Sequence, residues 1–422
     1  IYDCTGFGQA VKDISMKGIF MEKSLKKDII INRLPVVIYF ILIFASLMVI
    51  ISAVAPMSNH EPKTTDTYSD FSTGWLNCEE SEASLDHLSG TTVIHRTITA
   101  ADCNKTLFFF AKTSNINVFI DGVCQYRNNH FCSQFFGKTP GALFVNVLIP
   151  AESDGKLLEI EIENPYKDDD SAKLDEMYIG DISDIIQFQQ QKRFNSFCIS
   201  FIIMVLGVVM LLLFIPLTRQ KIVGIEFLNL GVTAFVSGLF LTTDGRYLQL
   251  VFGDAHIYHV IAETAMRLSI LPFLIFLSQM YDSYSKRIST ILCVIGEIAF
   301  AGCFIGEITE IMDYHETLFL VHVVFAISML FILVSTIKGI VKAPKENIYH
   351  NIGCIVLSFM AMTDIIILWR GTGRETSYFI RLGILIFFFM EIVQIMKKFL
   401  ASYQRNIKNE LLSRLAYRDG LT

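Results

Sequence analysis

Long apolar stretches dominate the pattern of hydrophobic and polar positions along this 422-residue chain. The first, residues 34–54, carries no charge and is long enough to cross about 30 Å of hydrocarbon as a helix. Similar stretches follow a more polar segment, at residues 194–217, 222–242, 257–280, 288–309, 317–340, 349–369 and 379–396. The pattern predicts a membrane α-helical bundle of eight spans, one followed by seven.

The segment between the first and second predicted spans, residues 56–193, has a β-strand pattern instead. Leu158, Ile160 and Ile162 alternate with glutamates, which is typical of a strand with one buried face. An Asp-Gly turn at 121–122 indicates a hairpin. Further strands are predicted at 93–98, 107–112, 116–121 and 143–149. We expect an all-β sandwich outside the cell membrane. The run around the hairpin resembles the jelly roll of galactose-binding-like domains.

Composition and charge agree with a membrane protein. Hydrophobic residues make up 52% of the chain and charged residues only 18%, with a net charge of −6 and no basic run that would indicate nucleic-acid binding. Lys23, Lys26, Lys27 and Arg33 precede the first span, which places the N-terminus in the cytoplasm by the positive-inside rule. Eight crossings then return the C-terminus to the cytoplasm.

The predicted outer domain contains four cysteines, Cys78, Cys103, Cys124 and Cys132. An even number on the oxidising side of a membrane indicates disulfides, and three connectivities are open. We favour Cys124–Cys132, which closes a short loop after the hairpin, together with Cys78–Cys103. Four free thiols are the alternative.

Two aromatic residues of this domain, Trp75 and Tyr126, have the flat faces that stack on a carbohydrate or another small molecule. Packing in the domain core is the favoured alternative for each. The histidines of the domain lack the spacing of metal ligands, so we expect neither a metal nor a cofactor in this chain.

Several ionisable residues fall inside predicted spans, where charge is costly, and four of them form a candidate polar cluster: Glu263, Arg267, Asp364 and Arg381. Glu263 and Arg267 are four residues apart, so they share a helix face and can pair. Asp364 and Arg381 are expected at a similar depth, in the outer half of the bilayer. The four could form a polar pocket that binds a ligand or receives the β domain. Pairing between helices that only fixes their packing is the favoured alternative.

A polar helix is predicted after the last span, because residues 397–417 contain neither Pro nor Gly. Apolar positions follow heptad spacing and then shift to steps of four, at Val393, Met396, Leu400, Tyr403, Ile407, Leu411 and Leu415. This pattern predicts a homodimeric coiled coil with a stutter. A single amphipathic helix that packs on its own chain is the alternative.

The last residues read Leu-Ala-Tyr-Arg-Asp-Gly-Leu-Thr and resemble the opening of a GGDEF domain, the diguanylate cyclase fold. The matching positions are Leu415, Ala416, Asp419, Leu421 and Thr422. The whole architecture resembles bacterial seven-transmembrane receptors with diverse intracellular signalling modules. The resemblance implies a protein of the bacterial cytoplasmic membrane whose output domain, active as a dimer, condenses two GTP into cyclic-di-GMP with Mg²⁺. Its catalytic residues would follow Thr422, so none lies in this chain.

These expectations divide the chain into six segments: a cytoplasmic N-terminal segment (1–33), a membrane anchor (34–54), the β-sandwich sensor domain (56–193), the seven-span bundle (194–396), a cytoplasmic signalling helix (397–414) and the start of a truncated GGDEF domain (415–422). A sensor with another output (an EAL phosphodiesterase, a phosphatase or a kinase) and a multi-span transporter are the alternatives. Transporters typically carry Gly- or Pro-broken spans in matched halves, and no such repeat is present.

Overall fold

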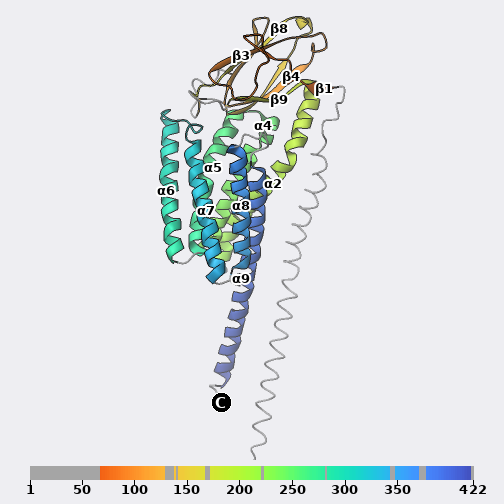
Figure 1. Ribbon diagram of the computed structural model, residues 1–422. Helices are drawn as coiled ribbons and strands as arrows, with labels where there is room; N and C mark the ends of the chain where they lie inside the picture. Colours follow the sequence, from red (N-terminus) through yellow and green to blue (C-terminus); the bar gives the residue numbers. More distant parts are fainter. Residues whose placement is uncertain are drawn as a thin grey trace, which may run out of the picture. The chain divides into compact units, whose positions relative to one another are not determined.

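The computed structural model describes residues 67–128, 137–138, 141–166, 172–219, 223–280, 283–342, 347–369 and 377–419. Within them, a β region precedes seven helices that are long and apolar enough to cross a membrane (Figure 1). The multi-pass membrane character predicted from the sequence is thereby confirmed. The predicted anchor at 34–54 and the segment before it lie outside the described residues.

The described β region forms two antiparallel sheets. Its strands are β1 (Tyr68–Asp70), β2 (Leu76–Asn77), β3 (Thr91–Thr97), β4 (Thr106–Lys112), β5 (Asn115–Ile120), β6 (Val123–Arg127), β7 (Ala142–Leu148), β8 (Leu157–Glu163) and β9 (Lys173–Gly180), with a short 3₁₀ helix, η2 (Ala151–Ser153), before β8. The four-stranded sheet has the order β1-β9-β4-β7, and the five-stranded sheet has the order β2-β3-β8-β5-β6.

Strand β8 shows why these residues form a sandwich. Leu158, Ile160 and Ile162 are fully buried, and they belong to one hydrophobic core to which both sheets contribute. The intervening glutamates lie on the other face, as the alternation predicts. At the predicted hairpin, Asp121 and Gly122 have φ values of 50° and 76°. Positive φ at both central residues is what a type I′ hairpin turn requires.

Strand β4 is buried on both faces. Leu107, Phe109 and Ala111 point into the sandwich core, whereas Phe108 and Phe110 are only 1% and 5% exposed on the opposite face. A strand of a two-sheet sandwich normally leaves its outer face to water. The outer face of the four-stranded sheet therefore needs a cover, which side chains from the helices supply.

The helices agree with the predicted spans. They are α2 (Ile182–Arg219), α3 (Ile225–Asp244), α5 (Ala255–Met280), α6 (Ser283–Ile308), α7 (Leu318–Lys342), α8 (Ile348–Trp369) and α9 (Tyr378–Asp419), with the short α4 (Tyr247–Phe252) between α3 and α5. Helix α2 begins at Ile182, before the predicted start at residue 194. Its first turns pack on the β region, where the Phe188 ring lies 5.7 Å from the ring of Tyr68 and 5.8 Å from that of Tyr178.

Close packing of α2 on α3 depends on two glycines. A Cβ atom at Gly207 would lie 2.3 Å from the backbone nitrogen of Phe235, and one at Gly238 would lie 2.3 Å from that of Met204. Small residues of this kind let two membrane helices bring their backbones together, where van der Waals contact replaces the hydrophobic effect as the source of stability.

Helix α9 is one unbroken helix that extends past its neighbours in the bundle (Figure 1). The predicted continuation of the last span into a polar helix is confirmed. Leu400 and Leu412, on this extension, are 40% and 54% exposed in the single chain. Of the residues that resemble the opening of a GGDEF domain, 415, 416 and 419 lie in α9, whereas 421 and 422 lie outside the described part of the chain.

Candidate functional site

An aspartate between α6 and α7 binds side-chain and backbone groups of the β region. Asp313 is 6% exposed. Its Oδ2 accepts hydrogen bonds from the backbone N–H of Lys138 at 2.8 Å and from the Tyr166 hydroxyl at 2.6 Å. Its Oδ1 accepts from the backbone N–H of His315 at 3.0 Å. Asp313 thus ties the connection between two helices to two separate loops of the β region.

The electrostatics of this aspartate favour its charged form. Burial alone would raise the pKa of Asp313, but the hydrogen bonds from Tyr166, Lys138 and His315 outweigh burial and lower that pKa below its ordinary value. Hydrogen bonds to an ionised carboxylate are about twice as strong as neutral ones. Asp313 is therefore an anion at neutral pH and a strong attachment point.

A neighbouring ion pair adds a weaker contact. Glu316 Oε1 lies 2.6 Å from Lys138 Nζ, and its Oε2 accepts the backbone N–H of Asp313 at 2.8 Å. The two side chains of the ion pair are 42% and 35% exposed, so solvent screens their attraction. The spacing Asp-x-x-Glu before an apolar helix, with the glutamate bonded back to the aspartate N–H, is that of a capping box.

The residue after Asp313 links this connection to α5. The Tyr314 carbonyl accepts from Arg267 Nη2 at 2.7 Å, and the guanidinium of Arg267 lies 4.1 Å from the centre of the Tyr314 ring. Arg267 also bonds Glu263 Oε2 at 2.5 Å, and Glu307 Oε2 accepts the N–H of Tyr314 at 2.5 Å. The predicted pairing of Glu263 with Arg267 on one helix face is confirmed.

The other two predicted intramembrane residues have different partners. Asp364 accepts the backbone N–H groups of Phe379 and Ile380 at 3.4 and 2.6 Å, which satisfies donors that the start of α9 leaves unpaired. Arg381 Nη2 lies 3.8 Å from Asp244 Oδ2, at the end of α3. The four predicted residues thus belong to two groups, one at α5 and the α6–α7 connection and one where α9 begins.

A second attachment joins β9 directly to α2. Glu176 Oε2 lies 2.7 Å from Arg193 Nη2, and its Oε1 lies 2.8 Å from Lys192 Nζ. Glu176 has a φ of 53° and sits at the β-bulge where β9 shifts register against β4. Burial would raise the pKa of Glu176, but the charges and hydrogen bonds of Arg193 and Lys192 outweigh it and lower that pKa to about 2.

Two arginines cover the aromatic outer face of the four-stranded sheet. The Arg193 guanidinium lies 5.0 Å from the ring centre of Phe144, and that of Arg246 lies 4.0 Å from the ring centre of Phe110. The Phe108 ring stacks on Phe144 at 5.4 Å. Planar guanidinium groups can cover aromatic faces while they keep polar partners, so this junction is both apolar and charged.

A glycine at this junction has no room for a side chain. Gly141 has a φ of 78°, and a Cβ atom there would lie 2.4 Å from Cγ of His259 on α5. We expect Gly141→Ala to destabilise the β region by roughly 1–3 kcal/mol, through backbone strain and overpacking. The measurement is thermal unfolding followed by Trp75 fluorescence in a Trp369→Phe background.

The matched control is Gly122→Ala. Gly122 has a φ of 76°, nearly that of Gly141, but no atom lies within 4 Å of a Cβ built there. An alanine at position 122 would therefore have the same backbone strain as one at position 141, without the steric clash. Equal losses of stability in the two variants would mean that contact with His259 is unimportant.

The two aromatic residues considered for ligand stacking, Trp75 and Tyr126, both contact the sandwich core. Trp75 is 1% exposed in the sandwich core, and its Nε1 donates to the Phe71 carbonyl at 2.8 Å. Tyr126 packs against the same core. Core packing, the favoured alternative, is therefore what the structure shows for Trp75. The N–H group of this buried indole has its hydrogen-bond partner inside the domain.

The predicted Cys78–Cys103 disulfide is not present, since both residues carry free thiols. Their Sγ atoms contact backbone carbonyls of Val93 and Thr99, at 3.8 and 3.6 Å. Val93 lies near the start of β3 and Thr99 lies two residues past its end, so about 20 Å of nearly extended chain separates them, whereas a disulfide needs Cα atoms within about 7 Å. Cys124 also carries a free thiol, and Cys132, its predicted partner, lies outside the described residues.

Sequence reasoning did not assign Asp313, Tyr166 or Lys138 to any site. The capping-box spacing from residue 313 to residue 316 was a usable signal, but it points to the start of α7 rather than to a contact with the β region. Comparison with known proteins adds no further assignment: no family model, no curated protein and no solved structure matches this chain.

Proposed function

We propose that this chain is the sensing and membrane-spanning portion of a bacterial diguanylate cyclase. The observation that carries the proposal is a short route from the β region to the start of α9. Arg246 lies over the Phe110 ring of β4. Two residues earlier, Asp244 accepts the Ser377 hydroxyl at 3.0 Å and lies 3.8 Å from Arg381. Because α9 then continues unbroken to Asp419, a shift at its start would move its far end.

The proposal includes an eight-span topology with a jelly-roll sensor domain outside the cell. Helix α2 follows β9 directly, so seven crossings would bring the end of α9 to the side opposite the β region. The excess of Lys and Arg at predicted inner loops supports a cytoplasmic location for that end. Strand orders β1-β9-β4-β7 and β3-β8-β5-β6 support the jelly roll, a double-sheet fold of eight main strands.

In this proposal the extension of α9 pairs with that of a second copy. Leu400, a position of the predicted heptad face, is exposed in the single chain, where a partner helix would cover it. The pair would hold two GGDEF domains, attached after Thr422, in a separation or rotation that permits or prevents condensation of two GTP with Mg²⁺. A small molecule or carbohydrate bound by the β region would select between the two arrangements.

The proposal is tested with the complete reading frame. We expect the sequence after Thr422 to continue with a G-[LV]-x-N-R run and then G-G-[DE]-E-F, and its expression in a bacterium to raise cyclic-di-GMP. A variant with the G-G-[DE]-E-F turn replaced by alanines is the control for background cyclases. A frame that continues into another fold, or a reporter after Thr422 that is active only outside the cytoplasm, would disprove the proposal.

A further inference from the structure

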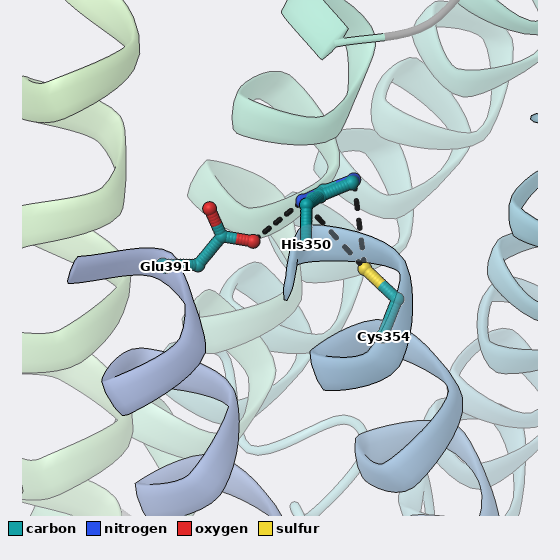
Figure 2. Close-up of side chains that lie close together, drawn as sticks. All are labelled: His350, Cys354 and Glu391. Atoms are coloured by element: carbon teal, nitrogen blue, oxygen red, sulfur yellow. Dashed lines mark hydrogen bonds and ion pairs between the residues drawn. The ribbon is translucent and has the colours of Figure 1, made fainter. Parts of the chain in front are cut away.

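Three potential metal ligands meet inside the helical bundle, away from the site described above. His350 and Cys354 lie four residues apart on α8, so they share one face of the helix, and Glu391 faces them from α9 (Figure 2). The three residues are 3%, 0% and 0% exposed, respectively. We call them the His350–Cys354–Glu391 cluster.

The distances between the ligand atoms of the cluster are close to those in an occupied metal site. Glu391 Oε1 lies 2.5 Å from His350 Nδ1, and Cys354 Sγ lies 4.0 Å from the same nitrogen. One ligand atom from each residue fits within a span of 4.8 Å. Ligands bound at the usual distances of about 2.0–2.3 Å to tetrahedral zinc are themselves roughly 3.3–3.8 Å apart. An ion would therefore replace the Glu391–His350 hydrogen bond after a side-chain shift of about 1 Å.

A second observation, at Glu391, favours a cation-binding site. Glu391 Oε2 is buried and has no hydrogen-bond partner among the described residues. A buried carboxylate oxygen without a partner costs free energy that a structure normally recovers with a donor or a cation. The ion pair with His350 satisfies only Oε1, and it gives no role to the thiol on the other side of the imidazole.

We propose that the His350–Cys354–Glu391 cluster binds one thiophilic divalent transition-metal ion, for which Zn²⁺ is the probe. One nitrogen, one sulfur and one oxygen donor suit Zn²⁺, whereas Mg²⁺ and Ca²⁺ prefer oxygen alone. On binding, the Cys354 thiol gives its proton to solvent and forms a metal–sulfur bond, and the proton shared by His350 Nδ1 and Glu391 Oε1 also leaves that hydrogen bond, so a neutral imidazole and an ionised carboxylate face the ion. The thiolate and the carboxylate then balance the two charges of the ion, so the loaded site is neutral.

The position of the cluster implies that a bound ion would link two helices. Glu391 precedes the part of α9 that extends past the bundle, and His350 and Cys354 are near the start of α8. A bound ion would therefore hold α9 to α8 close to the point where α9 leaves the bundle. The binding does not depend on the proposed cyclase output, and its test can fail or succeed independently of that proposal.

The test measures metal binding to the 422-residue chain, purified in detergent with a tag free of His and Cys. We expect about one Zn²⁺ per chain to survive dialysis, and Co²⁺ loading to give the thiolate-to-metal charge-transfer band. Cys354→Ser and Glu391→Gln should each weaken binding at least as much as the ~10–100-fold typical of outer-shell changes. Cys354→Ser should also abolish the charge-transfer band.

The matched control is Cys303→Ser, which removes another buried thiol, on α6. It should leave both the stoichiometry and the cobalt spectrum unchanged. If a variant of the cluster does not fold, the spectrum of the unmodified chain still decides the question. Absence of the charge-transfer band from the cobalt-treated chain, or equal Zn²⁺ binding by Cys354→Ser, would overturn the proposal.

Discussion

Replacing Arg193 with methionine is expected to destabilise the attachment of β9 to α2 by about 3 kcal/mol. Arg193 is 3% exposed and its partner Glu176 is 16% exposed. Removal of one member of a buried pair leaves the other charge without compensation, which typically costs about 3–5 kcal/mol. Lys192 remains beside the carboxylate at 2.8 Å and places the expected cost at the lower end of that range. The measurement is thermal or denaturant unfolding, followed by Trp75 fluorescence after Trp369→Phe.

The control is Lys192→Met, which removes the other cation from the same carboxylate. Because the Lys192 side chain is 37% exposed, we expect a loss below about 1 kcal/mol. Equal effects of the two substitutions would show that the Arg193 contact is no stronger than a surface ion pair.

Acid provides an independent check on the same pair. The pKa of Glu176 falls from an ordinary 4.5 to about 2 in the folded chain. Its contribution to stability is complete above pH 4.5 and is lost as pH falls towards 2, because only the unfolded chain takes up the proton in that window. The Arg193→Met variant should lose stability less steeply between these pH values. An unchanged slope would contradict the assignment.

The sequence predicts those parts of the fold that depend on local periodicity. Ile160 and its neighbours identify β8 because a strand with one wet face must alternate. The pair Glu263–Arg267 follows from helical spacing alone. Each of these inferences needs only residues a few positions apart. The helices likewise follow from the length of uncharged sequence that a bilayer requires.

What the sequence does not reveal depends on contacts between distant segments. Lys138 reaches Asp313 across 175 positions, and Glu391 reaches His350 across 41. No periodicity or spacing in the sequence indicates a contact between residues so far apart. The early start of α2 was missed for a related reason. Its first turns are polar, so a search for apolar length cannot find them, although Phe188 packs on the β region.

The burial of β4 on both faces is predictable from the sequence only in part. Its run of three phenylalanines, Phe108 to Phe110, predicts a strand. An apolar residue at every position also indicates cover on both faces, since one wet face would alternate. The identity of that cover, with Arg246 over Phe110 and Arg193 over Phe144, emerges only from the structure.

The second large effect is expected from Asp313→Asn. Both carboxylate oxygens of Asp313 accept N–H or O–H donors, and an amide can offer only one oxygen to them. The NH₂ group of the asparagine would point at one of these donors, which cannot accept a hydrogen bond from it. Hydrogen bonds to charged groups contribute about 1.5–3 kcal/mol each, so we expect a loss of roughly 2–4 kcal/mol. Tyr166→Phe, which removes a single donor, should cost less. Both are measured by unfolding followed through Trp75.

Glu310→Gln is the control for Asp313→Asn, because Glu310 is an exposed residue of the same connection and the change in net charge is identical. It should leave stability within about 0.5 kcal/mol of the unmodified chain. The lowered pKa of Asp313 means that its contribution is present above its ordinary pKa and is lost as pH falls. The Asn variant should therefore differ most at neutral pH and least in acid. A difference that is constant with pH would show that shape, and not the charge of Asp313, holds the β region to the helices.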